Sequence, residues 1–259
     1  MRRKTLLLAS VAALVVVAAE PSFAEGFYFS TSGGANFMRD RDGTFTTDFV
    51  RGGATYDAHY DFQTGFLLSS AIGLELDHWL RGLRVELEAS YRRNKLDGHW
   101  SVTTDNPDIV SPDAVATGAI NGHASTFALM ANAWYEFDIG TRFKPYVGGG
   151  MGWARSQIDG GFAVNPLSVT ALDVNPFEGF NVQSQGFAYQ LGAGITSQIM
   201  PGVSLGLGYR YFDAPDTEIF FAGKFIGLGD VSPAASSNNS IKFDNVSHSV
   251  ALTLTVDIN

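Results

Sequence analysis

Eight charged residues lie within segments where apolar and polar residues alternate. They are Glu75, Arg84, Glu86, Glu88, Arg92, Glu136, Lys144 and Arg210, four of each sign. Carboxylates and basic groups that line a narrow passage can relay protons or ions. The same groups can instead pair with one another and fill that passage. The choice between a conducting path and a charged plug depends on the elements that carry these residues.

Other residues with chemical potential form no complete site. Gly148–Gly152 lacks the lysine and the following helix of a phosphate-binding loop. Asp40–Gly43 lacks the further oxygen ligands of a calcium loop. In Ser247–Ser249 the histidine and its serine neighbours would point to opposite faces of a strand. The remaining histidines show no metal-ligand spacing and are His59, His78, His99 and His123. We therefore expect no catalytic, cofactor-binding or metal-binding residue, and no cofactor.

Composition narrows the classes of protein. The chain has 259 residues, a formal net charge of -9 and no cysteine. The acidic balance argues against nucleic acid as a partner, because no basic excess is present to neutralise phosphates. The absence of cysteine excludes disulfides and a cysteine-linked lipid anchor. Hydrophobic residues make up 45% of the chain, which is too many for a disordered tail.

The first residues have the features of an export signal. Arg2, Arg3 and Lys4 form a basic start, and Thr5–Ala19 is an apolar run. Ser22–Ala24 then supplies the small residues that a signal peptidase reads. We expect residues 1–24 to be a cleaved signal peptide and residues 25–259 to form one domain.

Eight later segments alternate with a period of two, which indicates β-strands. In the clearest, Leu83–Arg92, every odd position is apolar or small and every even position carries a charge or a hydroxyl. The others are Phe27–Phe37, Phe66–Leu76, Thr126–Glu136, Lys144–Trp153, Phe187–Thr196, Val203–Tyr211 and Ser249–Ile258.

The links between these segments alternate in length. Three are short: Asp77–Gly82, Asp138–Arg142 and Gln198–Gly202. Four are long: Met38–Thr64, Asn94–Gly122, Ser156–Gln185 and Asp213–Asp244. This pattern is typical of an outer-membrane barrel with short periplasmic turns and long extracellular loops.

A secreted β-sandwich or lipocalin-like barrel would alternate too, but would place its apolar face inside. Here the polar face carries the charged residues, so it cannot be a dry hydrophobic core, whereas it suits the inside of a barrel surrounded by lipid. Aromatic residues at both ends of the apolar faces agree with two membrane interfaces. We therefore predict an all-β fold, an eight-stranded antiparallel up-and-down transmembrane β-barrel with four long extracellular loops.

Several stretches resemble the outer-membrane β-barrel family of eight-stranded surface antigens and opacity-type proteins of proteobacteria, with an OmpA-like membrane domain. They are Leu83–Arg93, Phe127–Glu136, Pro145–Ala154, Leu207–Phe212 and Ser247–Leu254. The resemblance covers the strands and fails in the long loops. Such barrels usually end on an aromatic residue that the assembly machinery reads, whereas this chain ends Val256–Asn259.

We interpret the eight charges as a paired network that plugs the lumen, because side chains fill the inside of an eight-stranded barrel. The predicted role is that of a structural surface protein of the bacterial outer membrane, without enzymatic activity. Its expected partners are outer-membrane lipids, the barrel-assembly machinery during biogenesis and an extracellular partner met through the loops. A narrow porin-like channel for water, ions or very small solutes is the alternative, and a lipid-modifying enzyme is a third possibility.

Overall fold

The computed structural model describes residues 26–49, 52–104, 116–164, 177–220 and 240–258, and the regular elements in these ranges are β-strands. The predicted signal peptide, residues 1–24, lies outside the described residues, so its cleavage stays a prediction. Within the described ranges, no helix has the length and apolar character needed to cross a bilayer.

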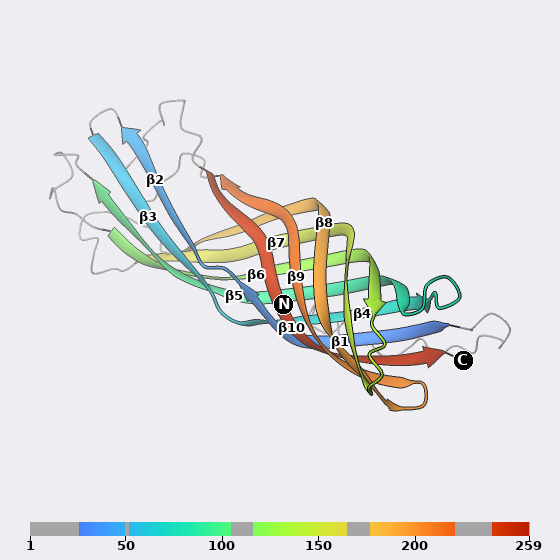
Figure 1. The fold of residues 1–259 in the computed structure, drawn as a ribbon. Helices are drawn as coiled ribbons and strands as arrows, with labels where there is room; N and C mark the ends of the chain where they lie inside the picture. Colours follow the sequence, from blue (N-terminus) through green and yellow to red (C-terminus); the bar gives the residue numbers. More distant parts are fainter. Residues whose placement is uncertain (1–25, 50–51, 105–115, 165–176, 221–239, 259) are drawn as a thin grey trace, which may run out of the picture.

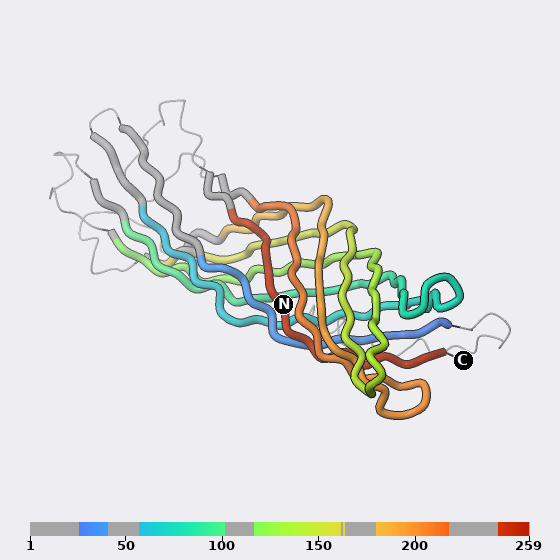
Figure 2. Tube along the Cα trace, in the orientation of Figure 1, coloured from blue at the N-terminus to red at the C-terminus, as the bar shows by residue number. Residues whose placement is uncertain are grey.

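Eight strands close into an antiparallel ring (Figure 1). The strands of the ring are β1 (Phe27–Met38), β4 (Gly65–Glu75), β5 (Leu83–Thr104), β6 (Ala116–Glu136), β7 (Phe143–Val164), β8 (Phe177–Met200), β9 (Val203–Phe220) and β10 (Ser240–Ile258). The first and last strands run side by side (Figure 2), in register from Phe27 with Ile258 to Met38 with Ser247. The predicted eight-stranded up-and-down barrel is confirmed.

The prediction was wrong for the first long link, Met38–Thr64. It contains two further strands, β2 (Arg41–Phe49) and β3 (Gly52–Phe62), which form a hairpin. This hairpin continues β1 and β4 beyond the ring, because β3 pairs with the distal half of β5 while β4 pairs with its proximal half. Within β3, Ala54–Phe62 alternates between apolar and polar residues as the other strands do, and the prediction overlooked this segment.

The other three long links are shorter than predicted. β5 continues to Thr104 and β6 begins at Ala116, so most of the link Asn94–Gly122 is strand. The links Ser156–Gln185 and Asp213–Asp244 are shortened in the same way, by the far ends of β7 to β10. The ends that carry these links are called the loop end, and the opposite end is called the turn end.

Glycines in the left-handed region form the three tight turns of the turn end. Gly82 has φ 84°, Gly140 has φ 74° and Gly202 has φ 72°, values that L side chains rarely adopt. The Gly82 amide donates to Asp77 Oδ1 at 2.7 Å, and the Gly140 amide donates to Asp138 Oδ1 at 3.1 Å. The predicted short links at these positions therefore have the residues that their backbone geometry requires.

The two faces of the ring near the turn end separate as the alternation predicts. Outward leucines are exposed, with Leu87 at 71% and Leu252 at 56%, whereas inward Glu88 and Arg92 are each only 2% exposed. An exposed apolar belt around a closed ring is the surface that a lipid bilayer covers.

Toward the loop end the polarity of the two faces reverses. The inward positions there form a hydrophobic cluster, which we call the outer core: Ala58, Tyr60, Leu96, Ile120, Ala124, Ile158 and Phe243. Outward positions on the same strands are polar, as with Lys95, Asp97 and Asn121. Most of these residues fall in the segments predicted as long links, so the sequence analysis made no prediction of their inner face. This part of the barrel has the apolar interior of a water-soluble β-structure.

The ladder between β8 and β9 ends before the loop end, at Tyr189 with Asp213. Side chains bridge the two strands beyond that point. Ser184 Oγ donates to the Pro215 carbonyl at 2.9 Å and lies 2.9 Å from Thr217 Oγ1. Asn245 Nδ2 of β10 donates to Thr217 Oγ1 at 2.9 Å. Hydroxyl and amide groups thus hold the outer wall together where backbone pairing stops.

The alternation of short and long links predicts which end of the barrel faces the outside of the cell. Because the chain has no cysteine, a single cysteine can be labelled without background. Asn121→Cys at the loop end should react with a membrane-impermeant maleimide on intact cells. Thr141→Cys in the turn between β6 and β7 should react only after permeabilisation. The reverse pattern would invert the topology.

Candidate functional site

The interior of the ring is the candidate site, because the predicted charged residues converge on it from several strands. At the turn end, Glu136 Oε1 lies 3.2 Å from Lys144 Nζ, and Glu136 Oε2 lies 3.5 Å from Arg84 Nη2. Thr196 Oγ1 donates to the same carboxylate at 2.8 Å. Glu136 therefore holds two basic groups at the entrance from the turn end.

Glu75 lies at the rim. It is the register partner of Arg84, as its place across the first turn indicates, but its side chain is exposed. The ion pair of Arg84 is with Glu136, from the strand on its other side. The sequence shows that Glu75 and Arg84 flank the same short turn, but it does not show which neighbouring strand the long side chain of Arg84 reaches.

Glu86 occupies the next level inward and is satisfied by three neutral donors. Trp134 Nε1 donates to Glu86 Oε1 at 2.7 Å, and Asn132 Nδ2 donates to the same oxygen at 3.0 Å. The Tyr28 hydroxyl donates to Glu86 Oε2 at 3.2 Å. A buried carboxylate that accepts several hydrogen bonds retains much of the stabilisation that water would supply.

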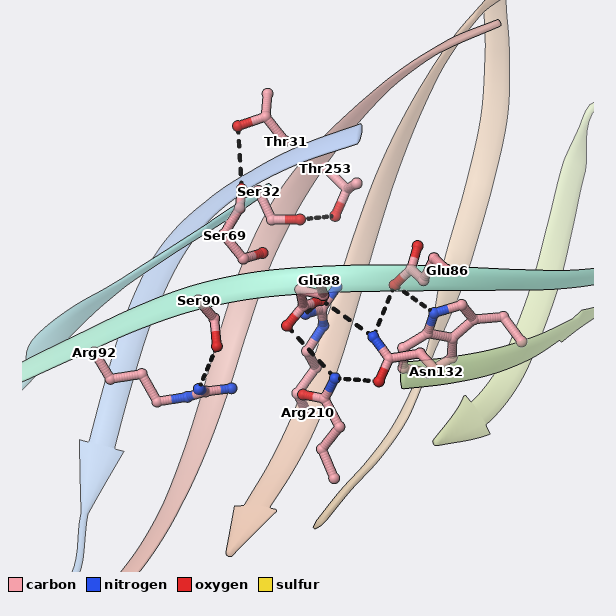
Figure 3. A network of polar contacts seen from close by, with 12 residues as sticks. Thr31, Ser32, Ser69, Glu86, Glu88, Ser90, Arg92, Asn132, Arg210 and Thr253 are labelled. Carbon is pink, nitrogen blue, oxygen red and sulfur yellow. Dashed lines mark hydrogen bonds and ion pairs between the residues drawn. The ribbon is translucent and has the colours of Figure 1, made fainter. Parts of the chain in front are cut away.

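Glu88 and Arg210 form a buried ion pair in the middle of the lumen (Figure 3). β5 and β9, which carry them, stand four strand steps apart in either direction around the ring of eight, so they lie on opposite walls. Gln190 Nε2 donates to Asn132 Oδ1 at 2.7 Å beside the pair. The contact between Glu88 and Arg210 therefore spans the full width of the barrel.

Arg92 makes a second contact between the same opposite walls. Its guanidinium carbon lies 3.8 Å from the centre of the Phe212 ring on β9, and its Nη1 donates to Ser90 Oγ at 2.9 Å. Among the described residues no carboxylate lies within ion-pair distance of Arg92. The guanidinium is instead held over an aromatic face, where the ring quadrupole favours a cation.

Amides and hydroxyls close the lumen above Arg92. Asn36 Nδ2 donates to Asn94 Oδ1 at 2.6 Å, and Ser249 Oγ donates to Asn36 Oδ1 at 2.7 Å. Beyond them the outer core begins, with Tyr60 and Phe243 in edge-to-face contact at 4.9 Å between ring centres. The filling of the barrel thus passes from charged to amide to apolar along its axis.

Sequence reasoning missed the aromatic residues of the interior. Trp134 and Tyr146 point inward and meet at 5.8 Å between ring centres. They occupy the space over inward glycines: a Cβ on Gly148 would lie 2.7 Å from Trp134, and one on Gly208 would lie 2.2 Å from the Tyr146 hydroxyl. The space beside these glycines is thus filled by aromatic rings. The alternation of β6 and β7 would have placed Trp134 and Tyr146 inside as well.

The weaker sequence candidates do not assemble into a reaction centre. Ser247 and Ser249 point inward and are buried, whereas His248 lies outside with its Nδ1 2.6 Å from the Tyr209 hydroxyl. Asp40 accepts a hydrogen bond from the Phe62 amide at 2.8 Å. Among the described residues, no group of three or more histidine, aspartate or glutamate side chains is arranged to hold a metal ion.

The Glu88–Arg210 pair predicts strong energetic coupling. Glu88→Gln alone leaves a buried guanidinium without its carboxylate and should cost about 3–5 kcal/mol of unfolding free energy, as should Arg210→Met alone. The double variant should lose much less than the sum of the two. The exposed pair Lys95–Asp97, 2.9 Å apart, is the matched control and should show coupling of about 1 kcal/mol or less. Urea unfolding in lipid vesicles measures both cycles, and additive losses at Glu88 and Arg210 would contradict the assigned pairing.

Comparisons with known proteins agree with this architecture. The family described as "Outer membrane protein beta-barrel domain" matches residues 6–253. The chain is 25% identical over 253 residues to an outer membrane protein of Gluconacetobacter diazotrophicus, which covers 86% of this chain and 63% of that protein. The chain thus spans slightly less than two thirds of that relative's length.

Two further proteins are similar. The chain is 25% identical over 234 residues to the outer membrane protein PagN of Salmonella typhimurium, covering 87% of this chain and 91% of PagN. Among solved structures, Neisserial surface protein A is 18% identical with a TM-score of 0.45, covering 90% of this chain and 97% of that one.

Proposed function

This chain belongs to the outer membrane protein beta-barrel domain family and lies in the bacterial outer membrane, and on this premise we propose that it is a closed structural barrel. Its membrane part anchors the protein, and its outer part presents a surface to partners outside the cell. We assign it no catalytic role. The proposal includes removal of residues 1–24 on export.

The observation that carries the proposal is the contact between opposite walls. Glu88 of β5 reaches Arg210 of β9. Four residues further along β5, Arg92 lies over Phe212, which is two residues further along β9. Side chains that touch across the diameter leave no open bore at those levels. Glu136 with its two basic partners and the amides of Asn36 and Asn94 add further barriers on either side.

The structure of the outer part supports the proposal that this end presents a surface to extracellular partners. The outer core gives the ring a stable water-soluble extension, and the strands that build it carry polar residues outward. Loops on a rigid scaffold commonly carry recognition, so we propose that extracellular partners bind at the loop end. Outer-membrane lipids contact the apolar belt, and the barrel-assembly machinery is a partner during insertion.

One observation favours the alternative of a narrow channel. Several buried polar atoms in the described part of the lumen have no protein partner: Arg84 Nε, Arg92 Nε and Nη2, Gln190 Oε1 and Ser247 Oγ. Buried polar groups without protein partners are commonly satisfied by internal water. A chain of such waters would pass protons or water without an open pore.

Planar-bilayer recording distinguishes the closed barrel from the narrow channel. The closed barrel predicts no stable conductance for the wild-type protein in potassium chloride. The variant Glu88→Ala/Arg210→Ala/Arg92→Ala should show small, steady openings, because it removes both contacts between opposite walls. The variant Lys95→Ala/Asp97→Ala, which alters the outer surface alone, should stay silent. A reproducible wild-type conductance would contradict the closed barrel, and proton flux into dye-loaded vesicles would favour the water-filled alternative.

A further inference from the structure

Two histidines far apart in the chain face each other on the outer wall of the loop end. His59 of β3 is the register partner of His99 of β5, and their ring centres lie 5.2 Å apart with the planes tilted by 41°. Both rings lie at the surface, and the neighbouring outward residues are polar. This pair became visible only with the β3–β5 pairing, since its sequence spacing matches no metal motif.

We propose that His59 and His99 together bind one divalent transition-metal ion of the zinc or copper class. Histidine nitrogens bind Zn²⁺ at about 2.0–2.1 Å, and the ring centre lies about 1.1 Å behind the nitrogen, so two rings on one tetrahedral ion have centres about 5 Å apart. The separation of 5.2 Å between His59 and His99 agrees with that value. Imidazole also suits these ions better than calcium or magnesium, which prefer oxygen.

Asp61 supplies the support that a metal-binding histidine needs. Its Oδ1 lies 2.9 Å from His59 Nε2. In the neutral ring, donation of the Nε2 proton to Asp61 leaves the lone pair on Nδ1, which is the form that can bind a metal. A carboxylate that holds the second nitrogen orients the ring and raises its basicity.

The charges around the pair favour a cation. Asp61 lies on the same face of β3 as His59, and Asp97, the register partner of Asp61, lies on β5. Lys95 offsets one of these charges through its contact with Asp97 at 2.9 Å. Two histidines occupy two positions of a tetrahedral ion, and in this proposal water or an external ligand takes the others. The site is therefore accessible and exchangeable, and a bound ion ties the β2–β3 hairpin to the ring.

Metal titration of the full chain tests the proposal. The protein is purified in detergent micelles without a polyhistidine tag. Zn²⁺ binding is measured by calorimetry, and Cu²⁺ binding is measured by electron paramagnetic resonance, which reports coordinated nitrogen. The wild type should bind one ion with two nitrogen ligands, and the affinity should fall between pH 7.5 and pH 5.5 because protons compete for imidazole.

Variants identify the ligands. His59→Asn/His99→Asn should abolish binding, and Asp61→Asn should weaken it about 10-fold or more, as loss of an orienting carboxylate does. His78→Asn at the turn end and His248→Asn beside Tyr209 are matched controls and should bind as the wild type does. Heat-dependent gel mobility checks that each variant is folded.

Two results would overturn the site. The first is a wild-type protein that binds neither ion more tightly than the His59→Asn/His99→Asn variant. The second is binding that is lost in a control histidine variant instead. Because the wild-type measurement needs no substitution, a variant that failed to fold would still leave the stoichiometry, the nitrogen count and the pH dependence to decide the question.

Discussion

A ring of eight strands is so narrow that side chains from opposite walls touch, and the rest of this structure depends on that constraint. Every inward residue must fit against residues from across the axis. Large side chains such as Trp134 and Tyr146 therefore lie over glycines, and Glu88 can reach Arg210 from the far wall. A charged group in such a space is stable only with a partner. The lumen is consequently organised in levels of matched groups.

The second constraint is the solvent outside the ring, which changes along the axis. Where lipid surrounds the barrel, the outer face supplies the apolar surface, and the interior can hold charges. Where water surrounds it, the hydrophobic effect needs an apolar interior, and the outer core supplies one. On β5 the inward positions pass from Glu88 and Arg92 to Leu96, while the outward positions pass from Leu87 to Lys95. One continuous strand thus belongs to two kinds of protein interior.

The ring strands could be predicted because the contrast between lipid and lumen imposes a strict period of two. The β2–β3 hairpin was missed, although Ala54–Phe62 also alternates between apolar and polar residues. The sequence does not show that this alternation continues the barrel with its apolar residues inside. The three short turns were predicted correctly. Each contains a glycine with positive φ, at Gly82, Gly140 and Gly202, as a tight turn requires. The partner of each individual side chain could not be predicted, because it depends on the register between strands. Arg84 meets Glu136 instead of Glu75, and His59 meets His99, because strand neighbours in space need not flank the same turn.

We propose that side chains close the interior of the barrel while its outer face passes from lipid to water. A spin-label scan along β5, with a cysteine placed at each position from Val85 to His99 in vesicles, measures both properties. Labels at Leu87, Ala89 and Tyr91 should collide with lipid-soluble oxygen. Labels at Arg93, Lys95 and Asp97 should collide with a water-soluble nickel complex. Labels at inward Ser90 and Leu96 should be protected from both. Free access of the nickel complex to Ser90 would show an open interior, and oxygen-dominated collisions at Lys95 and Asp97 would show that lipid also covers the outer part.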